Sequence, residues 1–191
     1  MIKIISLKKS FQDKVVLRDL SMTIEEGERV ALMGESGVGK TTLLRIIAGL
    51  ETPDSGVVKG RPDRIAYVFQ ESRLFEHLTA LDNVATVSDL PLKSARLRAK
   101  ECLDLVMLED SYHLYPRELS GGMAQRVAIA RALMPDADLI LLDEPFSALD
   151  GPTKTEIATR LDEYFQNKTV IMVTHNTADA SLLGARIIHL N

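Results

Sequence analysis

One stretch decides the fold of this chain: Gly34-Glu35-Ser36-Gly37-Val38-Gly39-Lys40-Thr41-Thr42. It matches the pattern Gly-x-x-x-x-Gly-Lys-Ser/Thr of a phosphate-binding loop. Its glycines leave room for phosphate oxygens to approach the backbone, and they can adopt the positive φ angles of a tight wrap. Lys40 can then reach the β- and γ-phosphates of a nucleoside triphosphate, and the Thr41 hydroxyl can ligate Mg²⁺.

The residues on either side of this loop support the interpretation. Residues 29–33 are a short apolar run typical of a buried strand, and residues 42–48 have the pattern of a helix. A strand, a glycine-rich loop and a helix N-terminus together bind anions through free N–H groups and the helix dipole. The alternative is a plain glycine-rich turn between two core elements, which the matching context disfavours.

The composition is that of an ordinary globular protein. The 191 residues are 46% hydrophobic and 26% charged, which fits one domain with room for a subdomain. A net charge of −4 without a long block of like charge disfavours a nucleic-acid partner. The densest basic cluster, Lys93, Arg96, Arg98 and Lys100, has the spacing of a solvated helix face.

Cysteine usage and hydropathy indicate where the chain works. Cys102 is the only cysteine, so an intrachain disulfide is impossible, and we expect a small buried hydrophobe in a reducing cytoplasm. The N-terminus lacks the long apolar stretch of a signal peptide, and no segment has the length needed to cross a bilayer. We therefore expect a chain that does not enter the membrane by itself. Because the chain stops just after its last predicted strand, we also expect no added regulatory domain.

Strands that alternate with helices predict an α/β fold, a mostly parallel sheet with helices on both faces. From about residue 71 to residue 134 the pattern is helical. Residues 11–14 and 49–56 are expected to form a turn and a loop, and residues 57–60 are too short a run to assign. The expected strands are residues 2–7, 15–24, 29–33, 64–69, 138–143, 169–173 and 186–190; the longer helices are residues 42–48, 92–108, 120–133 and 152–165.

Two further motifs carry chemistry. Asp143 and Glu144 end an apolar strand, at the edge of a doubly wound sheet where ligands bind. Asp143 is placed to hold Mg²⁺, and Glu144 could polarise an attacking water; an acidic turn is the alternative. Ser120-Gly121-Gly122 opens a helix, where a serine N-cap and exposed N–H groups form a second anion-binding device. Alone, this second motif would be weak.

Taken in order, the motifs resemble those of the nucleotide-binding subunit of an ATP-binding cassette (ABC) transporter, over nearly the whole chain. The resemblance implies a single ABC ATPase domain over residues 1–191, with residues 71–134 as the helical subdomain that carries the signature Leu119-Ser-Gly-Gly-Met123. Met123 replaces the more frequent Gln and is a known variant. The stretch from Lys40 to Gln70 is short, so the antiparallel β subdomain is expected to be trimmed. The motifs are the phosphate loop, Gln70, residues 119–123, Asp143-Glu144, Ser147-Ala-Leu-Asp150 and His175.

The resemblance also implies residue roles. Gln70 would sense Mg²⁺ and the γ-phosphate, His175 would contact the γ-phosphate, and Asp150 would align the opposing subunit. Phe11 would stack on adenine, where the family has Tyr. Each has a plain alternative: a polar residue at a strand end, a surface loop residue, a helix-terminal carboxylate and a core phenylalanine.

The function implied by the resemblance is Mg²⁺-dependent ATP hydrolysis that drives transport. Each ATP would lie between the phosphate loop of one subunit and residues 120–122 of another, in a homodimer or a heterodimer. The partners would be integral-membrane permease subunits, contacted through residues 76–84, and through them a solute-binding protein. The chain would be peripheral, on the cytoplasmic face of the cell membrane. Residues 119–123 and 143–150 look most like importers of the nitrate, sulfonate and taurine group.

Two alternatives stay open at this point. One is a soluble ABC-type ATPase that acts on ribosomes or DNA, although the second cassette, coiled coils or zinc sites of such proteins are absent from this sequence. The other is a scaffold that binds ATP without turnover, which the presence of Glu144 and His175 disfavours.

Overall fold

The computed structural model describes residues 1–12 and 14–190, and its centre is a five-stranded sheet. Every strand pair in this sheet is parallel, as the continuous apolar runs predict. The order is β5 (Ile65–Val68), β6 (Leu139–Asp143), β7 (Thr169–Val173), β3 (Arg29–Met33) and β8 (Arg186–His189).

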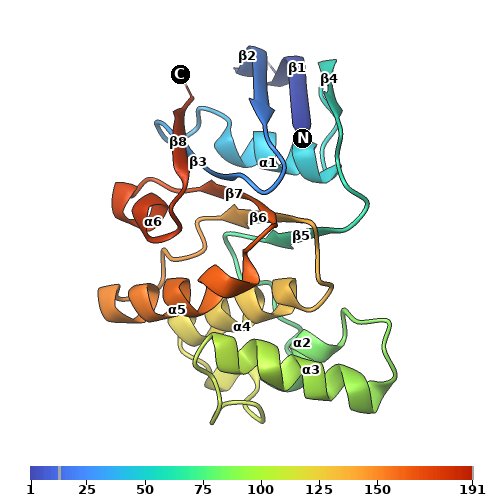
Figure 1. The fold of residues 1–191 in the computed structure, drawn as a ribbon, viewed down its shortest axis with the longest axis vertical. Coiled ribbons are helices and arrows are strands. Elements are labelled where there is room, and N and C mark those ends of the chain that lie inside the picture. The colour runs from blue at the N-terminus through green and yellow to red at the C-terminus, as the bar shows by residue number, and fades with distance from the viewer. Residues whose placement is uncertain (13, 191) are drawn as a thin grey trace.

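A three-stranded antiparallel sheet lies above the parallel one (Figure 1). Its order is β2 (Lys14–Ile24), β1 (Ile2–Phe11) and β4 (Ser55–Lys59). The predicted turn over residues 11–14 has its ends where expected, because Phe11 pairs with Lys14 as the first and last residues of a four-residue turn do; its residue 13 lies outside the described residues. The predicted loop over residues 49–56 ends early, since β4 begins at Ser55. There, pairing with β1 supplies backbone hydrogen bonds that side-chain polarity does not reveal.

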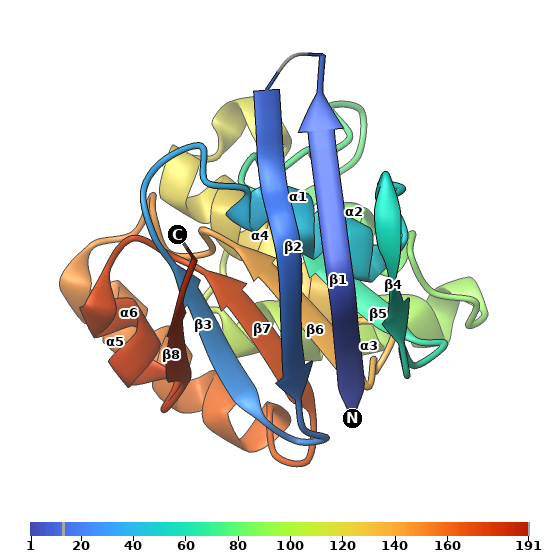
Figure 2. The ribbon, with the colours of Figure 1, turned by 90° about the horizontal axis from the view of Figure 1, so that it is seen from above.

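Helix α1 (Lys40–Ala48) is sandwiched between the two sheets (Figures 1 and 2). Its Leu43, Leu44 and Ile47 are fully buried, in one cluster with apolar side chains of β1, β3, β6 and β7. Because α1 packs on both sheets, its first turn and the phosphate loop before it have little freedom to move.

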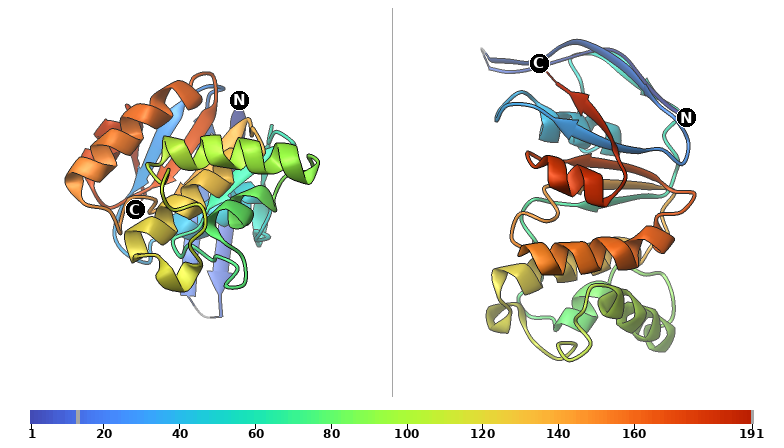
Figure 3. Two further views of the ribbon diagram at one scale, coloured as in Figure 1. Left: turned by 90° about the horizontal axis from the view of Figure 1, so that it is seen from below. Right: turned by 60° about the vertical axis from the view of Figure 1, so that its left-hand side comes forward.

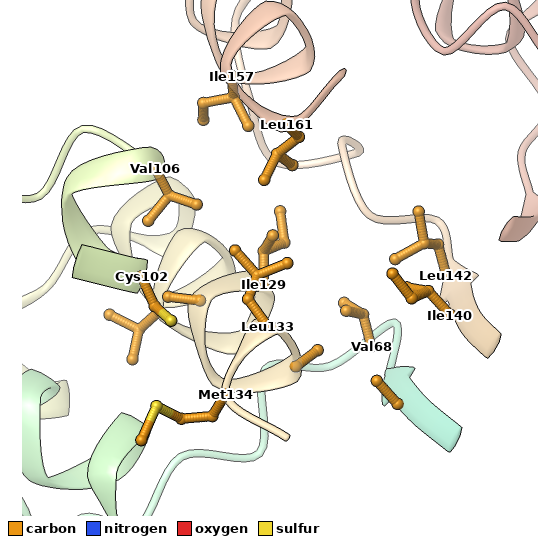
Figure 4. Packing of buried hydrophobic residues seen from close by; sticks show 14 of the residues in the cluster. Val68, Cys102, Val106, Ile129, Leu133, Met134, Ile140, Leu142, Ile157 and Leu161 are labelled. Atoms are coloured by element: carbon orange, nitrogen blue, oxygen red, sulfur yellow. The ribbon is translucent and has the colours of Figure 1, made fainter. Parts of the chain in front are cut away.

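The other face of the parallel sheet is covered by helices in two tiers (Figure 3). The tier nearer to the sheet consists of α4 (Gly121–Leu133) and α5 (Gly151–Tyr164). The outer tier consists of α2 (Ala80–Ala85), α3 (Leu92–Leu105) and the 3₁₀ turn Pro116–Glu118. The short helix α6 (Thr177–Leu182) follows β7. Cys102 is fully buried in the cluster that joins these tiers, as expected (Figure 4). Helix α3 ends earlier than predicted, because Met107 has a φ of 60° that no α-helix accommodates. Throughout residues 1–12 and 14–190, no helix combines the length and apolar character that a membrane crossing requires.

Candidate functional site: the cleft at the phosphate loop

The phosphate loop joins the carboxyl end of β3 to the first turn of α1. Gly37 and Gly39 have φ angles of 81° and 104°, in the region that favours glycine. Gly39 also caps α1, and a Cβ there would stand 2.9 Å from the Val16 carbonyl oxygen. The loop is therefore a fixed wrap that only glycine permits at position 39.

A cleft of about 340 Å³ opens over this loop. Its floor is the loop and the first turn of α1, and its walls come from Gln70 after β5, Glu144 after β6 and Val173 at the end of β7. These elements meet because the carboxyl ends of parallel strands lie at one edge of the sheet. The lining residues are Val16, Ser36, Gly37, Gly39, Lys40, Thr41, Thr42, Gln70, Glu144 and Val173.

The Lys40 ammonium is held at the mouth of the loop. Its Nζ donates hydrogen bonds to the carbonyl oxygens of Gly34 and Glu35, at 2.8 Å each. Both acceptors belong to the loop itself, so the positive charge lies within the curve of the loop. This arrangement suits a phosphate group, which would bind the ammonium as a charge-assisted partner.

The Asp143 carboxylate lies beside the cleft and is only 2% exposed. The Thr41 hydroxyl donates to its Oδ1 at 2.9 Å, and the Tyr67 hydroxyl donates to its Oδ2 at 3.3 Å. Burial raises the pKa of Asp143, and the two hydrogen bonds oppose that shift. A carboxylate beside a hydroxyl is a pair of hard oxygen donors, so these residues fit Mg²⁺.

Glu144 turns away from Asp143 although it is the next residue. Its φ is 50°, and its N–H donates to the Val173 carbonyl oxygen at 3.0 Å. The carboxylate thereby reaches the cleft, where its two oxygens lie 2.9 and 3.1 Å from Nδ1 of His175. His175 does not itself line this cleft; it is 72% exposed and reaches the site through Glu144. The structure thus brings Glu144 and His175 together, a contact that the sequence did not predict.

The motif predicted to be a second anion-binding device lies elsewhere in the molecule. Ser120 is the N-cap of α4, as predicted, and its Oγ accepts from the Met123 N–H at 3.2 Å. Gly121 has open space around it, whereas a Cβ at Gly122 would stand 3.0 Å from the Ala148 carbonyl oxygen. None of residues 120–122 lines the cleft at the phosphate loop. Asp150 caps α5, accepting from the Thr153 N–H at 3.0 Å.

Phe11 is exposed and stands apart from the cleft lining. It ends β1 with 46% of its surface exposed, so the alternative of a core phenylalanine is wrong. The ammonium of Lys9 lies 4.9 Å from the centre of its ring. Val16 on β2 lines the cleft instead.

The sequence interpretation missed two residues of the site, Val16 and Tyr67. Val16 lies on β2, a strand that the sequence predicted. The contact between Val16 and the loop depends on how β2 packs against Gly39, which the sequence does not reveal. Tyr67 lies on β5, next to β6, and the one available signal was a polar hydroxyl inside an apolar strand run.

Parallel strands, a glycine loop before α1 and a buried carboxylate beside Thr41 define the class of P-loop nucleotide-binding folds. The sequence profile described as "ABC transporter" matches residues 17–147, more than half of the chain. The chain therefore belongs to the ABC transporter family, in its ATP-binding domain, and the predicted resemblance and fold are confirmed.

Curated relatives support the same family. The chain is 42% identical to the sulfate/thiosulfate import ATP-binding protein CysA of Pseudomonas aeruginosa, over 100% of this chain and 64% of the relative. It is 43% identical to the aliphatic sulfonates import ATP-binding protein SsuB 1 of Rhodococcus jostii, over 98% of this chain and 78% of the relative. The chain thus spans less than two thirds of the length of the CysA relative.

Solved structures agree as well. The fold matches the dimeric structure of an ATP-binding cassette in a post-hydrolysis state bound to ADP and Pi. The TM-score is 0.91 and the identity 36%, over 100% of this chain and 94% of that one. A second dimeric structure, of a bacterial ABC transporter cassette, gives a TM-score of 0.92 at 37% identity, over 100% of this chain and 94% of that one.

Proposed function

We propose that this chain binds and hydrolyses ATP and thereby drives the import of a small solute through a separate membrane permease. The observation that carries the proposal is the convergence of Lys40, Gln70 and Glu144 on one cleft, with Thr41 bonded to Asp143. Phosphoryl transfer to water needs a backbone loop around the phosphates, a positive charge, oxygen ligands for a metal ion and a carboxylate that acts on the water. The cleft offers a group for each of these roles.

Binding of ATP is assigned to the loop residues 34–42, with Lys40 on the β- and γ-phosphates. Thr41 and Asp143 would hold Mg²⁺, and Gln70 would complete the metal site from the opposite wall. The metal would neutralise charge on the phosphate oxygens when bound. The adenine is assigned to Phe11, whose exposed ring carries the Lys9 ammonium near it and would offer its remaining open face to a base.

Hydrolysis is assigned to Glu144 as the base that orients and deprotonates the attacking water. Its carboxylate faces the cleft with 15% of the side chain exposed, so water can reach it. His175 holds that carboxylate from the solvent side and would contact the γ-phosphate. The positive φ of Glu144 is the backbone feature that separates the base from the metal ligand one residue earlier.

The active unit is proposed to be a dimer, homomeric or heteromeric. Residues 120–122 present a helix N-terminus that does not line the cleft of their own chain, so they would complete the site of a second chain. The relatives of known structure named above are dimeric cassettes. Two anion-binding helix ends from different chains can close on one triphosphate.

The permease is proposed to dock on the helical subdomain, residues 71–134, close to residues 76–84. Phe75 is 48% exposed there, beside the end of the Gln70 loop. The chain would then be a peripheral subunit on the cytoplasmic face of the cell membrane, reaching a solute-binding protein only through the permease. The two relatives are named for sulfate, thiosulfate and sulfonate import, so we propose an oxyanion of this kind as the solute.

A Glu144→Gln variant tests the chemistry, with Glu26→Gln as a control because the Glu26 side chain is 89% exposed and remote from the cleft. Glu144→Gln should bind Mg·ATP and release phosphate about 100-fold more slowly or slower still, because a general base contributes about 10²–10⁴-fold. Since ATP would join the subunits, this variant should accumulate as a dimer in gel filtration with Mg·ATP and not with ADP.

The control should match the parent protein in both assays. Phosphate release by Glu144→Gln at the parent rate would remove Glu144 from the mechanism. A monomer at saturating ATP would count against the dimer. A parent protein that binds ATP without releasing phosphate would favour the scaffold alternative.

A further inference from the structure

The Asp143 carboxylate is held from two sides by groups of different kinds. The Thr41 hydroxyl donates to Oδ1, and Thr41 is itself proposed as a metal ligand. The Tyr67 hydroxyl donates to Oδ2 and does not line the nucleotide cleft. Within residues 1–12 and 14–190, these are the side-chain hydrogen bonds that the carboxylate receives.

The Tyr67 ring is itself firmly placed. Tyr67 lies on β5 opposite Leu141 of β6, two residues before Asp143 on the neighbouring strand. Its ring packs on that of Phe69, with centroids 4.3 Å apart and planes tilted by 32°. The strand pairing and the stacked ring hold the hydroxyl within reach of Asp143, with the Arg45 guanidinium also close to it.

The stack continues into the helical subdomain. The Arg73 guanidinium lies 4.4 Å from the centre of the Phe69 ring. Arg131 of α4 donates to the carbonyl oxygens of Ser72 and Arg73, at 2.7 and 2.9 Å. The segment after Gln70 is therefore anchored to α4 on one side and, on the other, to the Phe69 ring that packs on Tyr67.

We propose that Tyr67 is a positioning residue that orients the Asp143 carboxylate for Mg²⁺, an inference that rests on the proposed function. The Thr41 hydroxyl would offer a lone pair to the metal while its O–H still donates to Oδ1, so it would serve the metal and the carboxylate together. The Tyr67 hydroxyl lies outside the cleft lining, so its role would be confined to holding Oδ2 and with it the carboxylate plane. A partner of this kind fixes ligand orientation, and losing it weakens metal affinity by about 10–100-fold.

The test removes only the hydroxyl, in a Tyr67→Phe variant that keeps the ring stacked on Phe69. The matched control is Tyr164→Phe, because the Tyr164 hydroxyl also makes a partly buried bond, to the Leu133 carbonyl oxygen at 2.7 Å, and Tyr164 does not line the cleft. A fluorescent ATP analogue is titrated into each variant, first in EDTA and then at increasing Mg²⁺. The readouts are the nucleotide affinity without metal and the Mg²⁺ concentration that gives half of the metal-dependent gain.

Tyr67→Phe should need about ten-fold more Mg²⁺, with an unchanged affinity in EDTA, and Tyr164→Phe should match the parent on both readouts. The inference is overturned if Tyr67→Phe needs the same Mg²⁺ as the parent. It is also overturned if affinity falls equally with and without metal, or if Tyr164→Phe shows the same shift. If the parent protein itself shows no Mg²⁺-dependent nucleotide binding, the proposed function fails and this inference with it.

Discussion

Replacing Gly39 by Ala should destabilise the phosphate loop by an amount that can be worked out from the φ angle of Gly39 and from the atoms around a Cβ built there. An alanine at a φ of 104° is strained by about 1–2 kcal/mol. Its Cβ would also stand 2.8 Å from side-chain atoms of Val16 and Leu17, and overpacking of this kind costs about 1–3 kcal/mol. Together these terms predict a loss of about 2–5 kcal/mol in the free energy of unfolding.

Two control variants separate the cost of backbone strain from the cost of overpacking. Gly27 has a φ of 74° and nothing within 4 Å of a built Cβ, so Gly27→Ala should cost only the backbone strain, about 1–2 kcal/mol. Gly151 has free space and no positive φ, so Gly151→Ala should change stability by about 0.5 kcal/mol at most. The chain contains no tryptophan, so urea unfolding is followed by circular dichroism.

Nucleotide binding gives the second readout of the same series. A loop that relaxes away from Val16 must be restored before it can wrap phosphate, so 2 kcal/mol or more of strain weakens ATP binding by about 30-fold or more. Gly27→Ala should lose stability and keep the affinity of the parent. The reasoning is refuted if Gly39→Ala binds ATP like the parent, or if it destabilises the fold no more than Gly27→Ala does.

Three further outcomes are expected. Lys40→Ala should weaken ATP binding by about 10–100-fold in calorimetry, because about 1.5–3 kcal/mol of charge-assisted bonding is lost; an unchanged affinity in a folded variant would contradict its role. Mixing inactive Lys40→Ala chains with inactive Ser120→Arg chains should restore part of the phosphate release, since one complete site forms per heterodimer; a fully active Ser120→Arg monomer would exclude the role across the dimer. Asn83→Ala should lower the melting temperature by about 5–10 °C, because this fully buried side chain bonds the backbone of Phe75, Leu78 and Thr79; an unchanged melting temperature would show that solvent replaces these bonds.

The sequence alone predicted two kinds of element: those made of continuous apolar residues, and those whose hydrogen bonds join residues close together in the chain. The strands at Leu139–Asp143 and Thr169–Val173 are almost entirely apolar, and a continuous apolar run of this length predicts a strand buried on both faces of a parallel sheet. The Ser120 cap and the phosphate loop could be predicted because their chemistry depends on adjacent residues. The roles of Thr41 and Asp143 followed from the loop motif and from the position of a carboxylate at the end of an apolar strand.

The rest depended on contacts between distant segments. The true length of the β1–β2 hairpin follows from pairing along β1, which shifts register three times between Ile4 and Ser10. The bond from Tyr67 to Asp143 joins neighbouring strands that are far apart in sequence, so neither residue signals it. The separation of residues 120–122 from the cleft depends on how the helical tiers pack, and no local pattern carries that information.

The last described residue has a consequence for protein engineering. The Leu190 N–H donates to the Met33 carbonyl oxygen at 2.8 Å, and a Cβ at Gly34 would stand 2.5 Å from the Leu190 carbonyl oxygen. The C-terminal label in Figure 2 accordingly lies near the turn from β3 to α1, away from the N-terminal label. A label attached to β8 near Leu190 would therefore press on the start of the phosphate loop. Met1 is exposed and does not line the cleft, so it is the better position for a label or for immobilising the protein.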